Sequence, residues 1–264
     1  MPHPDRRTFL TLGLPGWGAI TALHAQAQPA GQTKSPRIGA DPLLTSSGIT
    51  SRWEAGMRQD LGWAAQFETM RTSEVLRALE QGALDAGIFL THPRAEALDK
   101  DGLIFDRHTL ARTDVLLVGP EEDIAGIRGE SDATRAMKQV LAACRAGVAS
   151  WHPLEANSPL EALAHRLSDG QLRAALSLAA SLQAGQPLPT YRLMTRAQWH
   201  LTASQNKGAK IWLSGQPDLV MQAQVACSFH ARHPGAKLLV KWLQWPLAQQ
   251  ALRPRQTGWT GIKG

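Results

Sequence analysis

Hydroxyl side chains gather where the sequence predicts that helices begin. The run Thr45-Ser46-Ser47 follows a short strand that breaks at Asp41-Pro42. A helix start exposes unpaired backbone N–H groups and a partial positive charge, and nearby hydroxyls can cap the helix or donate to a bound anion. The pattern therefore indicates either an ordinary helix cap or a site for an anion.

Two later helix starts carry similar residue types. Thr72 or Ser73 is predicted to cap the second, and Glu74 falls in its first turn, where a negative charge interacts favourably with the helix dipole. Ser158 is predicted to cap the third, and Pro159 suits its first helical position because proline lacks an N–H. Further candidate polar groups lie beside these two starts: Arg71, Ser150, His152 and Asn157.

No enzyme motif accompanies these residues. The sequence contains no G-x-S-x-G, no G-x-x-x-x-G-K-[ST] and no G-x-G-x-x-G. His92 and Glu96 could form an acid/base pair, but a histidine that closes a structural hydrogen bond and a glutamate in the first turn of a short helix explain them better. Histidines and cysteines show no metal-ligand spacing. The sequence therefore predicts no catalytic residue, no metal and no cofactor.

Composition limits the class of protein. The chain has 264 residues, of which 43% are hydrophobic, so it can bury a core in one large domain or in two lobes. Its formal net charge of +6 is spread along the chain without a basic block or interleaved aromatic residues. This distribution disfavours nucleic-acid binding, although a mildly cationic surface favours encounters with anions.

The N-terminus has the three-part order of an export signal. Arg6-Arg7 precedes a weakly apolar stretch at residues 9–23 and a small-residue site that ends at Ala27. The apolar stretch is too short, and too interrupted by glycine and proline, to span a bilayer. Residues 1–27 resemble a twin-arginine signal peptide, which predicts export to the periplasm.

The two cysteines leave one question open. Cys144 and Cys227 lie in apolar surroundings typical of buried thiols. An oxidising compartment permits a disulfide, but a large separation in sequence says nothing about distance in space. Whether they pair cannot be decided from the sequence.

Short strand-like runs alternate with helical patterns, which favours an α/β fold with parallel βαβ units. The predicted strands are 37–40, 64–70, 85–90, 113–118, 147–150, 190–193, 211–213 and 223–229. The predicted helices are 48–61, 73–81, 131–143, 159–167, 170–184, 196–202 and 234–245. In open α/β sheets, ligands bind beyond the carboxyl ends of strands, where helix starts converge. We therefore expect the three helix starts to face one cleft.

The middle of the chain carries the most specific pattern. Residues 83–127 read ALDAGIFLTHPRAEALDKDGLIFDRHTLARTDVLLVGPEEDIAGI. The run resembles the tungstate-type branch of solute-binding proteins of ABC importers, with a histidine and acidic signature, a Thr-Asp hinge strand ending in V-G-P, and D-x-A-G-I. The matching residues are Asp85, His92, Pro93, Ala95, Glu96, Thr113, Asp114, Val118, Gly119, Pro120, Asp123, Ala125, Gly126 and Ile127.

This resemblance implies a two-lobed periplasmic-binding-protein fold of type II, with two doubly wound sheets joined by hinge strands near 115–118 and 202–211. Lobe 1 would comprise 36–118 and 205–264, and lobe 2 would comprise 119–204. Such a protein performs no chemistry. It would act as a monomer that closes on its ligand and delivers it to an ABC permease in the inner membrane.

The resemblance also implies a ligand, a small oxyanion of the tungstate or molybdate kind held by hydroxyls, helix-start N–H groups and an arginine. The second-lobe arginine of the family is missing here, and Arg71 could supply the positive charge from the first lobe. The candidate ligand-binding residues are Thr45, Ser46, Ser47, Arg71, Thr72, Ser73, Ser150, His152, Asn157 and Ser158.

Two departures from the family pattern keep alternatives open. Asp41 and Pro42 stand in the usually Thr/Ser-rich first loop, and an ionised Asp41 would repel an oxyanion while Pro42 removes a donor. Trp151 lies where the second lobe would supply polar groups. The altered site could therefore prefer another small polar solute. Alternatively, a degenerate scaffold could serve as a sensing or protein-interaction module, and a periplasmic enzyme is a distant third.

Overall fold

The computed structural model describes residues 35–182, 188–205 and 208–262, so the signal peptide predicted at residues 1–27 lies outside the described residues. The strands are β1 Ile38–Ala40, β2 Phe67–Thr69, β3 Ala86–Leu90, β4 Ile104–Pro120, β5 Ser150–Trp151, β6 Thr190–Thr195, β7 Ala209–Leu213, β8 Val220–Ser228 and β9 Thr260–Gly261.

The α-helices are α1 Pro42–Ser46, α2 Ile49–Leu61, α3 Thr72–Glu80, α4 Pro93–Lys100, α5 Ala133–Arg145, α6 Pro159–Leu167, α7 Leu172–Leu182, α8 Arg196–Leu201, α9 Gly235–Leu243, α10 Pro246–Gln250 and α11 Pro254–Thr257. A 3₁₀ turn covers Ala203–Gln205. Within the described residues, no helix combines the length and apolarity that crossing a membrane requires.

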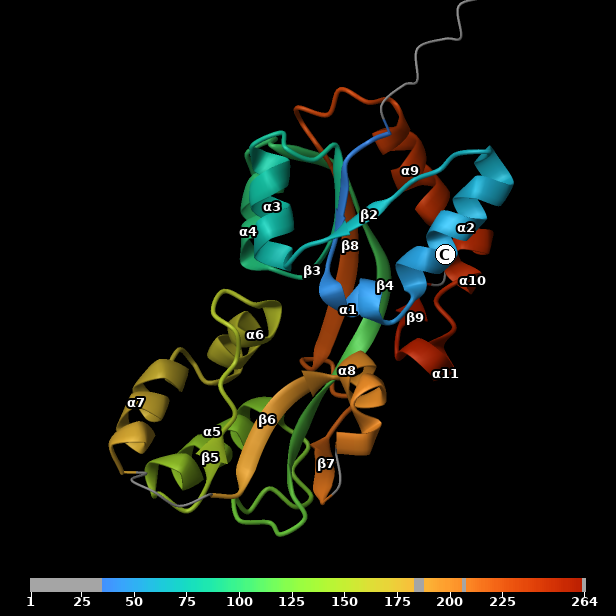
Figure 1. The fold of residues 1–264 in the computed structure, drawn as a ribbon. Helices are drawn as coiled ribbons and strands as arrows, with labels where there is room; N and C mark the ends of the chain where they lie inside the picture. Colours follow the sequence, from blue (N-terminus) through green and yellow to red (C-terminus); the bar gives the residue numbers. More distant parts are fainter. Residues whose placement is uncertain (1–34, 183–187, 206–207, 263–264) are drawn as a thin grey trace, which may run out of the picture. The chain divides into compact units, whose positions relative to one another are not determined.

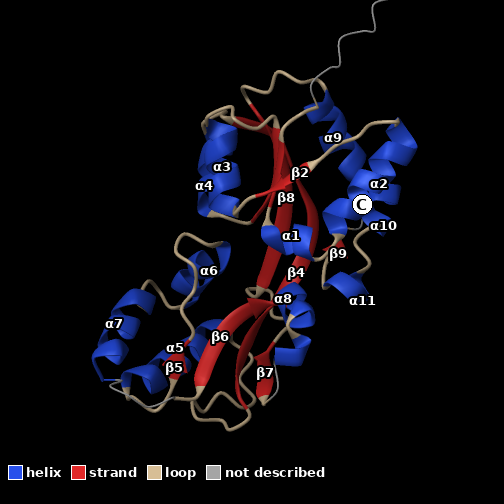
Figure 2. Ribbon diagram, viewed as in Figure 1, coloured by secondary structure: helices blue, strands red, loops and turns tan. Residues whose placement is uncertain are grey.

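Two sheets are connected through the long strand β4 (Figures 1 and 2). In the first sheet, β1 lies parallel between β2 and β3, β3 pairs antiparallel with β8, and β8 pairs antiparallel with β4. Beyond Asp114, β4 leaves β8 and pairs antiparallel with β6 and β7, and β6 pairs parallel with β5. The sheets are therefore mixed, and the predicted parallel βαβ units are found among β1 to β3 and between β5 and β6.

Helices cover both faces of the first sheet (Figure 2). One face packs on α3 and α4 through an apolar cluster that includes Leu76 and Phe89. The other packs on α2 and α9 in a larger cluster that includes Trp53 and Trp242. Strand β3 is buried at every position, as expected of a strand covered on both faces.

The close approach of β4 to Tyr191 of β6 in the second sheet depends on a glycine. A Cβ on Gly119 would lie 2.3 Å from Cδ1 of the Tyr191 ring, so only glycine lets the two strands approach this closely. The Tyr191 hydroxyl accepts a hydrogen bond from the Ala125 N–H at 3.1 Å. Burial of this ring raises the Tyr191 pKa. The second sheet is thus anchored to the D-x-A-G-I segment by one buried side chain.

The structure answers the question of the cysteines. Cys144 on α5 and Cys227 on β8 are both buried and free. Burial raises the pKa of the Cys144 thiol to about 11 and that of Cys227 to about 12. Neither thiol is therefore poised to react at neutral pH, because the thiolate is the reactive form.

Candidate functional site

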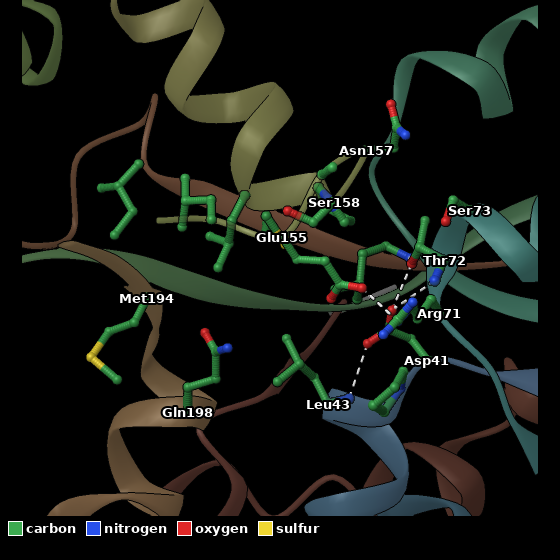
Figure 3. A pocket seen from close by; sticks show the side chains of 18 of the residues that line it. Asp41, Leu43, Arg71, Thr72, Ser73, Glu155, Asn157, Ser158, Met194 and Gln198 are labelled. Carbon is green, nitrogen blue, oxygen red and sulfur yellow. Dashed lines mark hydrogen bonds and ion pairs between the residues drawn. The ribbon is translucent and has the colours of Figure 1, made fainter. Parts of the chain in front are cut away.

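A cavity of about 470 Å³ lies between elements of the two sheets, beside the starts of α1, α3 and α6 (Figure 3). Its polar lining consists of Asp41, Arg71, Thr72, Ser73, His152, Glu155, Asn157, Ser158, Arg192, Gln198 and Thr202. Its apolar lining consists of Pro42, Leu43, Leu90, Pro153, Leu154, Ala156, Pro159, Leu160, Leu193, Met194 and Met221.

Asp41 ties the first two helix starts together. One carboxylate oxygen, Oδ1, accepts a hydrogen bond from the Leu43 N–H at 3.0 Å. The other, Oδ2, accepts from the Thr72 N–H at 3.2 Å and from the Thr72 hydroxyl at 2.7 Å. The Thr72 hydroxyl in turn accepts from the Leu90 N–H at 2.9 Å. Asp41 is thus the N-cap of α1 and also holds the first residue of α3.

The Asp41 side chain is buried at the edge of the cavity, and this position affects its ionisation. Burial raises the Asp41 pKa, and the hydrogen bonds from Leu43 and Thr72 offset only part of this rise. The negative charge of Glu155 raises it further. The protein thus stabilises the charged form of Asp41 incompletely.

Arg71 takes the cap position of α3, where Thr72 or Ser73 was predicted. The correction has a physical reason: the Thr72 side chain turns to Asp41, while the Glu74 carboxylate accepts from the Arg71 N–H at 3.0 Å. Arg71 Nε lies 2.5 Å from Glu155 Oε1, in a pair whose side chains are both more than half exposed. Ser73 lines the cavity beside them.

The start of α6 is confirmed as predicted. The Ser158 hydroxyl accepts from the Glu161 N–H at 3.1 Å, and Pro159 holds the first helical position. Asn157 adopts a left-handed backbone with φ 58°, a conformation that asparagine tolerates better than most residues. Its N–H donates to Glu161 Oε2 at 2.6 Å. Asn157 and Ser158 therefore reach the cavity from a tightly bonded turn.

Replacing Ser158 by alanine should cost about 1 kcal/mol of unfolding free energy, because the Glu161 N–H would lose its partner. Urea denaturation followed by circular dichroism measures this change. Ser177→Ala is the matched control, since the exposed Ser177 hydroxyl on α7 donates to the Ala174 carbonyl within its own helix. Equal stability losses in the two variants would contradict the role of Ser158 as a cap.

Thr45, Ser46, Ser47 and Ser150 are not brought to this cavity. The hydroxyls of Thr45 and Ser46 donate to the Pro42 carbonyl, and that of Ser47 donates to the Leu44 carbonyl. They sit at the end of α1, because this helix already begins at Asp41-Pro42. The next helix, α2, starts at Gly48 without a side-chain cap. The prediction that these hydroxyls open a helix is therefore wrong.

Ser150 faces the neighbouring strand. Its hydroxyl lies 2.7 Å from the Thr190 hydroxyl and donates to the Leu188 carbonyl at 3.3 Å. His152, two residues further on, does line the cavity, and its N–H donates to the Tyr191 carbonyl at 2.8 Å. Of the ten candidate residues, the cavity therefore brings together Arg71, Thr72, Ser73, His152, Asn157 and Ser158.

Further lining residues were missed by the sequence analysis, among them Glu155, Arg192, Met194, Gln198 and Thr202. Glu155 and Met194 show no local signal, because their place depends on how distant segments meet. Gln198 does show a local signal. Thr195 caps α8, and the Gln198 side chain accepts from the Thr195 N–H at 2.8 Å. The spacing T-x-x-Q before an apolar run is that of a capping box.

His92 has the structural role predicted for it. As N-cap of α4 its Nδ1 accepts from the Arg94 N–H at 3.2 Å, and Glu96 lies in the first turn. Burial lowers the His92 pKa. Among the described residues, no three His, Cys, Asp or Glu side chains group in a way that could hold a metal ion.

Comparison with known proteins decides the fold. Neither a family model nor a curated protein matches the sequence. A periplasmic candidate metal-binding protein superposes with a TM-score of 0.73 and 18% identity, over 87% of this chain and 97% of its own. The tungstate-binding protein TupA from Desulfovibrio alaskensis G20 superposes with a TM-score of 0.68 and 17% identity, over 87% and 99%.

This chain has the two-lobed fold of a periplasmic binding protein. A third solved structure, the tungstate ABC transporter from Geobacter sulfurreducens, superposes with a TM-score of 0.62 and 16% identity, over 83% of this chain and 98% of its own. The α/β type II fold implied by the sequence resemblance is therefore confirmed. At these identities the likeness establishes the periplasmic-binding-protein fold, and the ligand has to be argued from the cavity.

Proposed function

We propose that the protein is a solute-binding protein of an ABC importer, which captures a small polar solute between two lobes and delivers it to a permease in the inner membrane. Lobe 1 comprises residues 36–118 and 205–264, and lobe 2 comprises residues 119–204. The observation that carries the proposal is the cavity of about 470 Å³, whose lining comes from α1 and α3 on one side and from the segment before α6 on the other.

The ion pair between Arg71 and Glu155 suits a protein that opens and closes. Arg71 belongs to lobe 1 and Glu155 to lobe 2 in this division. Because both side chains are more than half exposed, their attraction is screened by water and contributes little to stability. The pair can therefore break as the lobes separate to admit a solute, and it can form again on closure.

The proposed function also implies a cellular location. A receptor that feeds an inner-membrane permease works in the periplasm as a monomer, and residues 1–27 would direct its export by the twin-arginine route. Protease protection of the full chain in intact cells and its release by osmotic shock would test this location. Retention in the cytoplasm after both arginines, Arg6 and Arg7, are changed to lysine would support the route.

An oxyanion is one candidate ligand. The names of two similar structures mention tungstate, and Arg71, Ser73 and the start of α6 provide groups that favour an anion. The buried carboxylate of Asp41 is the observation against it. The degenerate-scaffold alternative gains no specific support, because a degenerate site needs no cavity of this size. Catalysis is not part of the proposal.

A thermal-shift screen tests whether the cavity captures a solute. The full chain is expressed with its export segment, purified from the periplasm, and mixed with tungstate, molybdate, sulfate, phosphate and small organic solutes. A bound solute at 100 times its Kd should add about 2.7 kcal/mol of stability and raise Tm. Absence of a shift with every solute would refute the proposal, and turnover of a solute would support an enzyme instead.

Arg71→Ala should leave the Tm of the unliganded protein almost unchanged, because it removes only an exposed ion pair. Its affinity for whichever anion binds should fall at least ten-fold, since the cavity loses one of its positive charges. Calorimetric titration measures the affinity. Arg77→Ala removes the same charge from an exposed position on α3 outside the cavity and is the control. An equal affinity in both variants would remove Arg71 from the site.

A further inference from the structure

Asp41 is a buried carboxyl group that lines the cavity close to Arg71 but is not paired with it. Its side chain belongs to a residue that is only 5% exposed, and no ion pair to it forms within the described part of the chain. Arg71, the cation on the adjoining helix start, pairs instead with Glu155. A buried carboxylate is stable in its ionised form only when a partner compensates the lost hydration.

Asp41 also takes the donors that an oxyanion would need at this end of the cavity. The N–H groups of Leu43 and Thr72 and the Thr72 hydroxyl all donate to its carboxylate. A tetrahedral dianion placed here would find these donors occupied and would meet a like charge. Glu155, whose negative charge raises the Asp41 pKa, adds a second carboxylate at this end of the cavity, where it pairs with Arg71.

The rest of the cavity suits a larger and less polar molecule. Figure 3 places Asp41, Arg71 and Thr72 together at one end and Met194 with Gln198 at the other. Leu154, Leu160 and Met194 contribute apolar wall. A volume of about 470 Å³ falls in the range of sites for small organic molecules, about 300–1,000 Å³. A four-oxygen anion would leave most of it unfilled.

We propose that the solute is a small organic amine, whose protonated nitrogen lies against Asp41 and whose apolar body lies along the leucine and methionine wall. The inference rests on the proposed function as a solute-binding protein and specifies the ligand class. An ammonium group supplies the positive charge that Asp41 lacks, and its N–H donors can use the acceptor capacity left on Oδ1, which takes one hydrogen bond from the protein.

The ionisation of Asp41 agrees with this assignment. Burial raises the Asp41 pKa in the unliganded protein. A bound ammonium would favour the ionised carboxylate and lower that pKa again. The apolar wall contributes to affinity but does not distinguish an amine from other molecules of the same shape. The charge of the polar end therefore decides the ligand class.

Three probes of equal chain length test the charge preference in the wild-type protein: n-hexylamine, hexan-1-ol and hexanoate, with tungstate as a fourth. Calorimetric titration at neutral pH should show that hexylamine binds at least ten-fold more tightly than each of the others. Tighter binding of hexanoate or tungstate, or equal binding of all three six-carbon probes, would overturn the assignment. This comparison requires no variant and is therefore independent of folding defects.

Asp41→Asn tests the residue itself. The amide keeps the shape of the side chain but not its charge, so hexylamine affinity should fall at least ten-fold while hexanol affinity stays the same. Asp132→Asn is the control, because Asp132 caps α5 at an exposed position away from the cavity. Unchanged hexylamine affinity in folded Asp41→Asn would overturn the inference.

The wider solute screen separates this inference from the proposed function. If another solute binds in the cavity and hexylamine does not, the amine assignment fails while the solute-binding function stands. If no solute of either set binds, both fail.

Discussion

Trp53→Ala should lower the free energy of unfolding by about 3–5 kcal/mol. The Trp53 side chain on α2 is completely buried in the larger apolar cluster, and its Nε1–H donates to the Ala248 carbonyl at 2.9 Å. Truncation would leave a cavity the size of an indole ring and a buried carbonyl without its donor. Guanidinium denaturation followed by far-ultraviolet circular dichroism measures the loss without relying on tryptophan fluorescence.

Trp245→Ala is the matched control for this prediction. The Trp245 side chain lies at the start of α10, close in sequence to the same cluster, but it is 46% exposed. Its truncation should change stability by much less than that of Trp53. If both variants lost the same free energy, the stability would not depend on the buried position of Trp53, and the assignment of this core would be wrong.

The packing of Trp53 is connected to the cavity through α1. Leu44 of α1 is fully buried in the same apolar cluster as Trp53. This burial fixes α1 and therefore Asp41, which caps it. A loosened core should consequently weaken solute binding as well as stability.

Most element positions could be predicted from the sequence because their signals are local. The helix at 159–167 is an example, since Ser158, Pro159 and the apolar spacing all lie within it or beside it. Strand β4 shows the opposite case. Only residues 113–118 were predicted, although the strand begins at Ile104. Its first half contains Asp106 with φ 51° and two register shifts against β8, so it lacks the regular alternation that predicts a strand.

In the candidate site too, features with a local sequence signal could be predicted and contacts between distant segments could not. The sequence places Ser158 correctly because Ser-Pro is a local signal for a cap followed by a first helical residue. Asp41-Pro42 is the same kind of signal, and the structure shows a helix there. Because hydroxyl residues favour cap positions, the run Thr45-Ser46-Ser47 predicts a helix start several residues after the observed one. By contrast, the pairing of Arg71 with Glu155 links segments far apart in sequence, and no local pattern reports it.

Asp41→Ser should convert the cavity into one that binds tungstate at least ten-fold more tightly than the wild-type protein does. The substitution removes the carboxylate that occupies the Thr72 N–H and hydroxyl, while serine can still cap α1 by accepting from the Leu43 N–H. Two like unit charges about 4 Å apart repel by about 4 kcal/mol at an effective dielectric constant of 20, so even a fraction of this repulsion gives the expected change. Calorimetric titration with tungstate measures the affinity.

Asp132→Ser provides the control, because it removes a carboxylate from another helix cap outside the cavity and changes the net charge equally. A gain of tungstate affinity in both variants would attribute the effect to net charge and contradict the local explanation. The gain in Asp41→Ser should also disappear when Arg71→Ala is added, since the freed donors and the guanidinium would hold the anion together. If Asp41→Ser folds and binds tungstate no better than the wild-type protein, Asp41 is not what keeps the oxyanion out.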